Sequence, residues 1–235
     1  SAPPTTDRPL IGASMFGNTT RLVENARALL EEAGFEVVTF HAVGSGGRTL
    51  ERLAADGILA GTFDVTTTEW ADELCEGVFS AGPERLDAAG ARGLPQVIAP
   101  GCLDMANFGA METVPARFRD DPSRKFYVWN PQVTLMRTTP EENATLGRIL
   151  AEKANASRGP VEVFFPLRGV SILDSVTVDG PQPFWWPEAD AALLDALRTH
   201  LRPGIPLHEV DANVNDDAFV AATTEAMIRL MASMR

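Results

Sequence analysis

The stretch FEVVTFHAVGSGGRTLERLA, residues 35–54, contains the pattern that points to the fold of this chain. Its first half is an apolar run typical of a buried strand, and its last residues carry apolar side chains at helical spacing. Between them lie three glycines in four positions, Gly44, Gly46 and Gly47. Glycine adopts backbone dihedral angles that other residues avoid. The stretch therefore predicts a strand, a tight turn and a helix in direct succession.

The same succession of strand and helix patterns recurs along the chain. Six apolar segments predict strands, at residues 9–14, 35–41, 58–65, 94–99, 161–166 and 207–211. Helical patterns follow them, and the helix expected at 139–156 opens with a capping box of Thr139 and Glu142. Such alternation predicts a doubly wound α/β domain with a mainly parallel sheet, a Rossmann-like or flavodoxin-like three-layer sandwich.

Composition is that of an ordinary globular chain, with 235 residues, 45% of them hydrophobic and 22% charged. The net charge of −12 argues against a nucleic-acid partner. No apolar run approaches the roughly 20 residues that span a bilayer, so no membrane partner is expected. Residues 1–8 lack the features of a signal peptide, so we interpret them as a linker or the cut end of a longer chain, and residues 9–235 as a single α/β domain. Cys75 and Cys102, without CxxC spacing, favour a reducing compartment, by default the cytoplasm.

The loops that follow the strands predict a ligand site. Ligands of parallel sheets bind at the carboxyl ends of the strands, and right-handed crossovers bring these loops to one edge. Helix starts and arginines suit a small anionic ligand bearing phosphate or carboxylate. The expected ligand-binding residues are Ser14, Phe16, Gly17, Asn18, Thr19 and Thr20 in the first loop, Gly44, Ser45, Gly46, Gly47 and Arg48 in the second, Thr66, Thr67 and Thr68 in the third, and Gly101, Arg137 and Arg168 after later strands.

Neither glycine turn matches a standard nucleotide motif. Residues 17–20 lack the lysine and the spacing of a Walker A loop. Residues 44–48 would place the third glycine of a dinucleotide fingerprint at Thr49. The anion interpretation therefore depends on geometry, and the alternative for each loop is a glycine-rich connection with a surface arginine.

His41 and Asp104 are the candidate catalytic residues. His41 ends a predicted strand and titrates near neutrality, and Asp104 follows a Pro-Gly turn at another strand end. The alternatives are a hydrogen-bonded rim histidine and a turn-capping aspartate. A nucleophilic Cys102 would need His41 as its base. No metal site is predicted, because His200 and His208 lack partners at ligand spacing.

Six motifs carry a resemblance to a known family. They are MFGNTT at 15–20, FHAVGSGGR at 40–48, DVTTTE at 64–69, PGCLDM at 100–105, VTLMRTTPEEN at 133–143 and PLRGVS at 166–171. From about Arg8 to Arg235 the chain resembles the carboxy-terminal half of the family of the tobamovirus-resistance protein, a plant ATP-binding protein with uncharacterised bacterial relatives. The resemblance implies a companion amino-terminal α/β domain, which is absent from this chain. It also implies ATP or another phosphorylated ligand as a cofactor, without saying which half binds it.

Three functional hypotheses follow. The first is a domain that binds an anionic nucleotide or metabolite and acts with the companion domain. The second is an acid/base enzyme half-site that uses His41 and Asp104. The third is an assembly module of a homo-oligomer, with Phe184, Trp185 and Trp186 as the contact surface.

Overall fold

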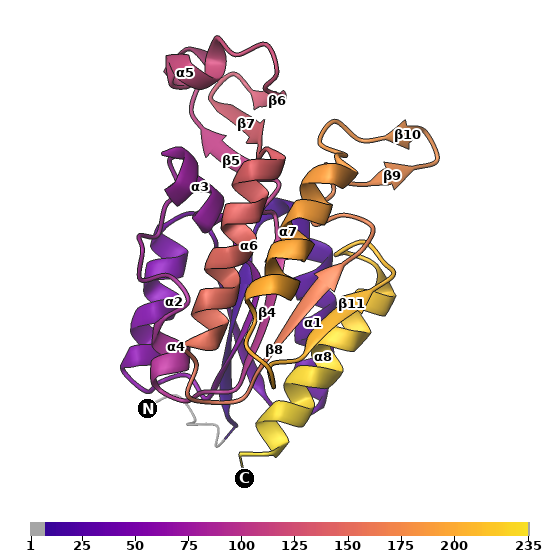
Figure 1. Cartoon of the computed structure of the whole chain (residues 1–235). Helices are drawn as coiled ribbons and strands as arrows, with labels where there is room; N and C mark the ends of the chain where they lie inside the picture. Colours follow the sequence, from indigo (N-terminus) through magenta and orange to yellow (C-terminus); the bar gives the residue numbers. More distant parts are fainter. Residues whose placement is uncertain (1–7, 235) are drawn as a thin grey trace.

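A central six-stranded sheet organises the protein in a computed structural model that describes residues 8–234 (Figure 1). The strand order is β11-β8-β4-β3-β1-β2, and every neighbouring pair is parallel. The strands are β1 (Leu10–Met15), β2 (Glu36–His41), β3 (Gly61–Thr66), β4 (Gln96–Gly101), β8 (Val161–Pro166) and β11 (Leu207–Val210). All six coincide with apolar segments that the sequence predicts as strands, because each carries apolar side chains that pack into the clusters beside the sheet.

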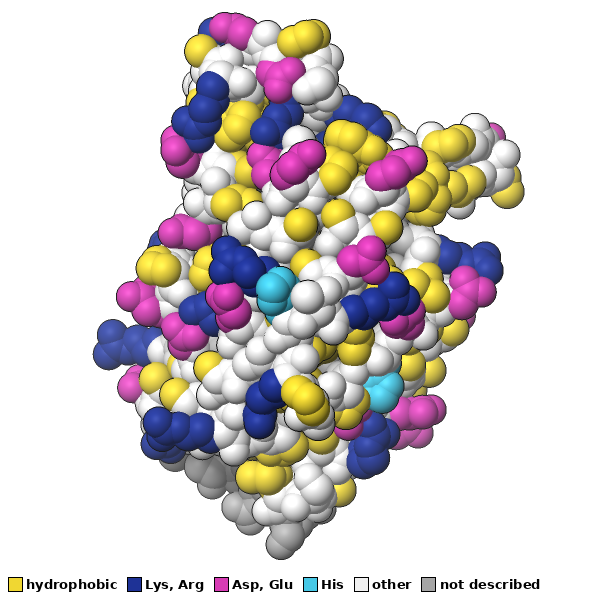
Figure 2. Space-filling view, in the orientation of Figure 1, with side chains coloured by type: hydrophobic (Ala, Val, Ile, Leu, Met, Phe, Trp, Pro, Cys, Tyr) yellow, Lys and Arg dark blue, Asp and Glu magenta, His cyan; other side chains and the backbone are white. Residues whose placement is uncertain are grey.

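Two further β structures project beyond the carboxyl ends of these strands (Figure 1). The first is an antiparallel sheet in the order β5-β7-β6, made of β5 (Met105–Phe108), β6 (Phe126–Asn130) and β7 (Val133–Arg137). The turn η2 (Met111–Thr113) and the short helix α5 (Ala116–Arg119) connect β5 to β6. The second is a hairpin of β9 (Val176–Thr177) and β10 (Gly180–Pro181), over which hydrophobic side chains gather at the surface (Figure 2).

These projections make the expected simple three-layer sandwich of Rossmann-like or flavodoxin-like type a wrong description of the chain. About thirty-five residues leave the parallel sheet after β4 and build a separate antiparallel sheet before the chain returns at α6. Their strands have only four or five residues, and β6 is largely exposed. Such short, half-polar segments carry little periodicity, so the sequence predicts only one strand in this region, at 126–129.

Helices cover both faces of the parallel sheet (Figure 1). One face packs against α1 and α8, and the opposite face against α2, α4, α6 and α7. The helices are α1 (Thr20–Glu32), α2 (Ser45–Ala55), α3 (Glu69–Cys75), α4 (Ala88–Ala91), α6 (Pro140–Asn155), α7 (Pro187–His200) and α8 (Asp217–Ala232), and the turn η1 (Gly17–Thr19) precedes α1. No helix within residues 8–234 is both long and apolar enough to cross a bilayer.

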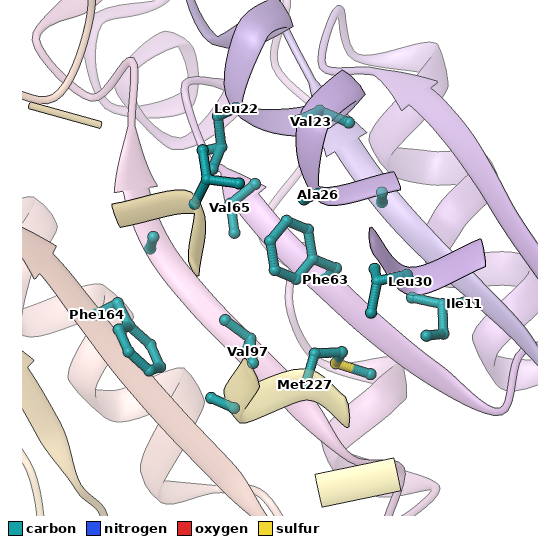
Figure 3. Packing of buried hydrophobic residues seen from close by; sticks show 14 of the residues in the cluster. Ile11, Leu22, Val23, Ala26, Leu30, Phe63, Val65, Val97, Phe164 and Met227 are labelled. Atoms are coloured by element: carbon teal, nitrogen blue, oxygen red, sulfur yellow. The ribbon is translucent and has the colours of Figure 1, made fainter. Parts of the chain in front are cut away.

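The core between the sheet and α1/α8 explains why the strands read as continuous apolar runs. Phe63 and Val97 of the central strands meet Leu22 of α1 and Met227 of α8, all fully buried (Figure 3). Adjacent residues of the same strands point to the other face, where Ile98 packs against α6 and α7. A strand that is buried on both faces carries apolar side chains on both, so its sequence does not alternate between apolar and polar residues.

Two capping boxes expected from the sequence have different outcomes. The Thr139 hydroxyl accepts a hydrogen bond from the Glu142 amide at 3.3 Å, and the Glu142 carboxylate accepts one from the Thr139 amide at 2.8 Å, which confirms the first. For the second, the spacing of Thr66 and Glu69 in the sequence predicts a capping box at the start of a helix, and this prediction is wrong. Thr66 is the last residue of β3, α3 begins only at Glu69, and the Glu69 carboxylate turns away to another loop.

Most of the expected linker at residues 1–8 lies outside the described residues, which begin at Arg8.

Candidate functional site

A crevice with a volume of about 410 Å³ lies where β1 and β2 end. Its lining comes from segments far apart in the sequence: Phe16, Gly17 and Asn18 after β1, His41 at the end of β2, Phe79 after α3, and Trp129, Asn130, Val133 and Leu135 on and between β6 and β7. The antiparallel sheet therefore supplies one wall of a hollow whose other wall is the edge of the parallel sheet. Four of the expected site residues, Phe16, Gly17, Asn18 and His41, meet here.

The loop after β1 is held by the chain itself and leaves its glycine open. The Thr19 hydroxyl accepts a hydrogen bond from the Phe16 amide at 3.1 Å and lies 2.8 Å from the Thr66 hydroxyl. The carbonyl of Asn18 accepts a bond from the Asn215 side chain at 2.9 Å. A Cβ added to Gly17 would meet nothing within 4 Å, so this position faces open space. The loop that leads through η1 into α1 therefore lines the crevice.

Aromatic rings line the crevice on both sides. The rings of Phe16 and Phe79 meet edge to face with centroids 6.1 Å apart. Trp129 stands at the lip on β6 and is 61% exposed. Phe79, Trp129 and Asn130 are not among the site residues expected from the sequence, because nothing local to 79 or 129–130 shows that the antiparallel sheet folds back toward β1.

The glycine loop already holds an anion, which is the carboxylate of Glu69. The Gly44 and Gly47 amides donate to Glu69 Oε1 at 2.7 and 3.0 Å, and the side chain is buried. A Cβ on Gly46 would lie 1.8 Å from the His41 carbonyl oxygen, and one on Gly47 would lie 2.1 Å from Glu69 Oε2. The glycines thus serve a close intramolecular contact, and these two amides are not free to bind an external ligand.

Arg85 completes this buried network. Its guanidinium donates to Glu69 Oε2 at 2.7 Å, to Asp64 Oδ1 at 2.6 Å and to Glu51 Oε1 at 3.3 Å. Burial raises the pKa of Glu51 although Arg85 opposes this shift. Sequence reasoning missed Arg85, since a single arginine in a short helical pattern carries no signal that three acidic side chains surround it.

The remaining residues of the second loop lie away from the crevice. The Arg48 guanidinium donates to the Ser80 carbonyl at 2.9 Å. Arg48, Ser45 and Thr49 line a separate hollow of about 340 Å³ on the outer face of α2.

The expected hydroxyl ligands of the first and third loops are used inside the protein. Ser14 Oγ accepts a bond from the Thr66 amide at 2.9 Å. The hydroxyls of Thr67 and Thr68 donate to carbonyls of β4 and β5, each at 3.1 Å. Thr20 Oγ1 donates to the Gly17 carbonyl at 3.2 Å.

Gly101 serves the same packing of strand ends. A Cβ on this residue would lie 2.2 Å from the Val65 carbonyl oxygen, so β3 and β4 come together here at a distance that only glycine permits. Gly101 and the third-loop threonines therefore hold the strand ends together, and none of them lines the crevice.

The two later arginines lie elsewhere on the same edge. Arg168 is exposed and pairs with both carboxylate oxygens of Asp211 at 2.7 and 2.8 Å, beside a second hollow of about 630 Å³ under the hairpin. Arg137 is fully buried among Asp104, Asp174 and Asp190.

The two candidate catalytic residues do not share the crevice. His41 lines it, whereas the side chain of Asp104 is fully buried and accepts a hydrogen bond from Ser171 at 2.7 Å. Burial, followed by the negative charge of Asp174, raises the pKa of Asp104 to about 7. Burial also raises the pKa of the Cys102 thiol well above its ordinary value, which disfavours a thiolate nucleophile.

Among residues 8–234, no three His, Cys, Asp or Glu side chains gather to hold a metal ion. His208 instead lies 2.7 Å from Glu162. In the aromatic excursion Phe184 is buried, and Lys125 lies 4.3 Å from the ring centroid of Trp186.

Comparison with known proteins places the chain in a family. Residues 8–231 match the C-terminal domain of the uncharacterised protein family UPF0261. A UPF0261 protein of Clostridium tetani is 46% identical over 96% of this chain and 54% of its own length. The ToMV resistance protein Tm-1 of Solanum lycopersicum is 36% identical over 96% of this chain and 29% of its own length. The chain thus spans about half the length of the bacterial relatives it matches.

The solved structures that resemble the chain are remote. A monoacylglycerol lipase of Paleococcus ferrophilus shares 11% identity over 97% of this chain and 96% of its own, with a TM-score of 0.44. A thioesterase domain from the curacin biosynthetic pathway shares 12% identity over 96% of this chain and 91% of its own, with a TM-score of 0.37. Neither of these remote structures supports the expected Rossmann-like or flavodoxin-like class, and that assignment is not retained. What stands is a mostly parallel six-stranded sheet with helices, and scores this low transfer no function.

Proposed function

This chain belongs to the UPF0261 family as its C-terminal domain, and we propose that it binds a small anionic ligand in the crevice at the ends of β1 and β2. The observation that carries the proposal is the convergence of the β1 loop, His41 and the β6–β7 wall on one hollow. Its volume of about 410 Å³ falls within the range of about 300–1,000 Å³ usual for small-molecule sites.

The polar character of the crevice supports an anion. The thirteen-residue helix α1 follows the loop of Phe16, Gly17 and Asn18 that lines the crevice, and the start of a helix carries partial positive charge. His41 adds a side chain that can donate, and none of the nine lining residues is acidic. The lining of the crevice therefore lacks the acidic side chains that give the chain as a whole its net charge of −12.

The apolar lining supports a ligand that also has a planar or apolar part. Phe16, Phe79 and Trp129 present aromatic faces around the crevice. Nucleotides and phosphorylated or carboxylated aromatic metabolites combine these two properties. A nucleotide is also the ligand class that we expect from the plant family, although nothing in the lining selects ATP over related compounds.

A companion domain belongs to the same proposal. The bacterial relatives are nearly twice as long as the region they share with this chain. The crevice opens at the edge where the antiparallel sheet and the hairpin project, and this edge is the natural place for a second domain to close over a bound ligand.

Titration of the purified chain with ATP, ADP, pyrophosphate and inorganic phosphate, followed by calorimetry and tryptophan fluorescence, tests the proposal. Gly17→Leu should block the crevice without disturbing the fold, because the glycine faces open space, and His41→Gln should remove a donor. We expect each to weaken binding of the tightest probe about tenfold or more, the loss of one to two good contacts. Trp129→Phe should remove the fluorescence change.

Two variants serve as matched controls. Arg168→Gln lies beside the other hollow and should bind like the wild type. Arg48→Ala tests the glycine-loop surface. Binding that survives Gly17→Leu and His41→Gln but is lost in Arg48→Ala would refute the crevice as the site.

A further inference from the structure

Three buried aspartates surround a single buried arginine beneath the antiparallel sheet. Arg137 Nη2 lies 2.7 Å from Asp190 Oδ1 and 3.6 Å from Asp174 Oδ1. Asp104 faces the same guanidinium and the Asp174 carboxylate. Arg137, Asp104 and Asp174 are fully buried, and the side chain of Asp190 is 13% exposed. The cluster lies outside the crevice and takes no part in the proposed ligand contacts.

The cluster has few hydrogen-bond donors for its six carboxylate oxygens: besides Arg137, the described structure shows the Val170 amide donating to Asp174 Oδ2 at 2.9 Å and Ser171 donating to Asp104 Oδ2. The Arg137 donors are directed at the Phe184 carbonyl at 2.8 Å, at Thr138 Oγ1 at 3.2 Å and at Asp190. Two carboxylate oxygens, Asp104 Oδ1 and Asp174 Oδ1, are buried without a hydrogen-bond partner within the described chain, although Asp174 Oδ1 lies 3.6 Å from Arg137 Nη2. An unpaired buried carboxylate oxygen is costly, and protonating a neighbouring carboxyl group would supply the missing donor.

The charges of the cluster also fail to balance. With all three aspartates ionised, one guanidinium would leave a net charge of −2 in a site where Arg137, Asp104 and Asp174 are fully buried and only Asp190 is in part exposed. The other groups facing the cluster are neutral: Ser171 donates to Asp104, and the thiol of Cys102 lies beside it. No further cation is among the groups that interact with these side chains in the described structure.

We propose that this cluster is a proton-binding site, in which the Asp190 carboxyl group holds a proton against the Asp174 carboxylate and so fastens β7 to α7 and to the loop after β8. The pair is the natural place for the proton because a protonated Asp190 can hydrogen-bond to Asp174. Burial, followed by the charge of Asp174, raises the pKa of Asp190 to about 8, against the opposing effect of Arg137. Burial combined with a neighbouring carboxylate is also what makes carboxylic acid pairs in other proteins hold a single proton between them.

The site links four segments that are distant in sequence. Arg137 ends β7, Asp104 follows β4, Asp174 follows β8, and Asp190 lies in the first turn of α7. Leu135, two residues before Arg137 on the same strand, lines the crevice. Loss of the proton should therefore loosen the wall of the crevice, and this last consequence alone depends on the proposed function.

The direction of the pH effect follows from the raised pKa values. The closed form holds the proton more tightly than an opened form, whose aspartates titrate near the ordinary value of 3.8. The stabilisation is complete below about pH 4 and is lost as the pH rises toward about 8. Opening that releases one proton grows about tenfold per pH unit within this window and levels off above it.

Hydrogen exchange of the ligand-free chain between pH 5 and 9, corrected for the intrinsic exchange rate, tests the proposal. Peptides covering 126–137 and 170–190 should show opening that increases about tenfold per pH unit and reaches a plateau near pH 8. Asp190→Asn keeps an acceptor for Arg137 and carries a permanent donor toward Asp174, so its profile should be nearly flat. Asp104→Asn, which places a donor at the orphan oxygen, should flatten the profile in part and serves if the first variant does not fold.

The matched control is Asp211→Asn, which removes an exposed carboxylate paired with Arg168 on the neighbouring loop and should follow the wild type. A flat wild-type profile, or asparagine variants that keep the wild-type slope, would overturn the proposal. Because no ligand is added, a failure of the proposed ligand binding leaves this result unaffected.

Discussion

The contact between Glu69 and the glycine loop offers the sharpest test of how this structure is held together. Glu69→Gln keeps the size of the side chain and an oxygen that can still accept from the Gly44 amide. It removes the charge facing Arg85, and it can place an amide N–H₂ group against the guanidinium N–H that now donates to Glu69 Oε2 at 2.7 Å. Two donors would then face each other in a site where both side chains are essentially inaccessible.

The expected magnitude follows from the composition of the network. Removing one member of a buried ion pair typically costs about 3–5 kcal/mol, because the other charge stays buried and unpaired. Arg85 keeps Asp64 and Glu51, so we expect the lower end of that range, about 3 kcal/mol. For a chain of this length each kcal/mol lowers Tm by about 2–4 °C, which gives a fall of about 6–12 °C.

Urea denaturation followed by circular dichroism, together with calorimetry, measures this loss. The matched control is Glu152→Gln, which breaks an exposed pair with Arg148 on the surface of α6 and should cost no more than about 0.5 kcal/mol. If Glu69→Gln were no more destabilising than Glu152→Gln, then the carboxylate would not be what the glycine loop is built around, and the loop would again be a candidate for external anions.

Other parts of the structure make further predictions. Gly46→Ala should prevent stable folding or cost about 3 kcal/mol or more, a fall in Tm of at least about 6–12 °C, since its Cβ would collide with the His41 carbonyl; soluble yield and calorimetry would show this. Phe219→Ala should lower the free energy of unfolding by about 3–5 kcal/mol, because it leaves a cavity beside α8; a wild-type urea midpoint would contradict this. Thr139→Ala should cost about 0.5–2 kcal/mol through loss of the cap of α6, seen as a matching fall in the urea midpoint. Burial raises the pKa of Asp72 to about 7, so the contribution of this carboxyl group to the free energy of unfolding should fall as the pH rises from about 4 to 7. Asp72→Asn should therefore show a weaker decline in Tm over that pH range than the wild type.

The sequence alone was sufficient for the features that local spacing encodes. Apolar runs located all six strands of the parallel sheet, and the capping box at Thr139 and Glu142 located the start of α6 within one residue. Position after a strand was also enough to place Phe16–Asn18 and His41 at the edge where a crevice lies. These properties depend on neighbours within a few positions along the chain, and such neighbours produce a periodic pattern of apolar residues in the sequence.

Only the tertiary structure decided what each strand-end loop faces. The Gly44 and Gly47 amides meet a carboxylate 22–25 residues further along the chain, and Arg137 meets aspartates from three other segments. A glycine turn has the same local sequence whether its amides bind an external phosphate or an internal carboxylate. Which of the two it binds depends on how distant segments pack, since the burial of a charge and the identity of its partner are properties of the assembled fold.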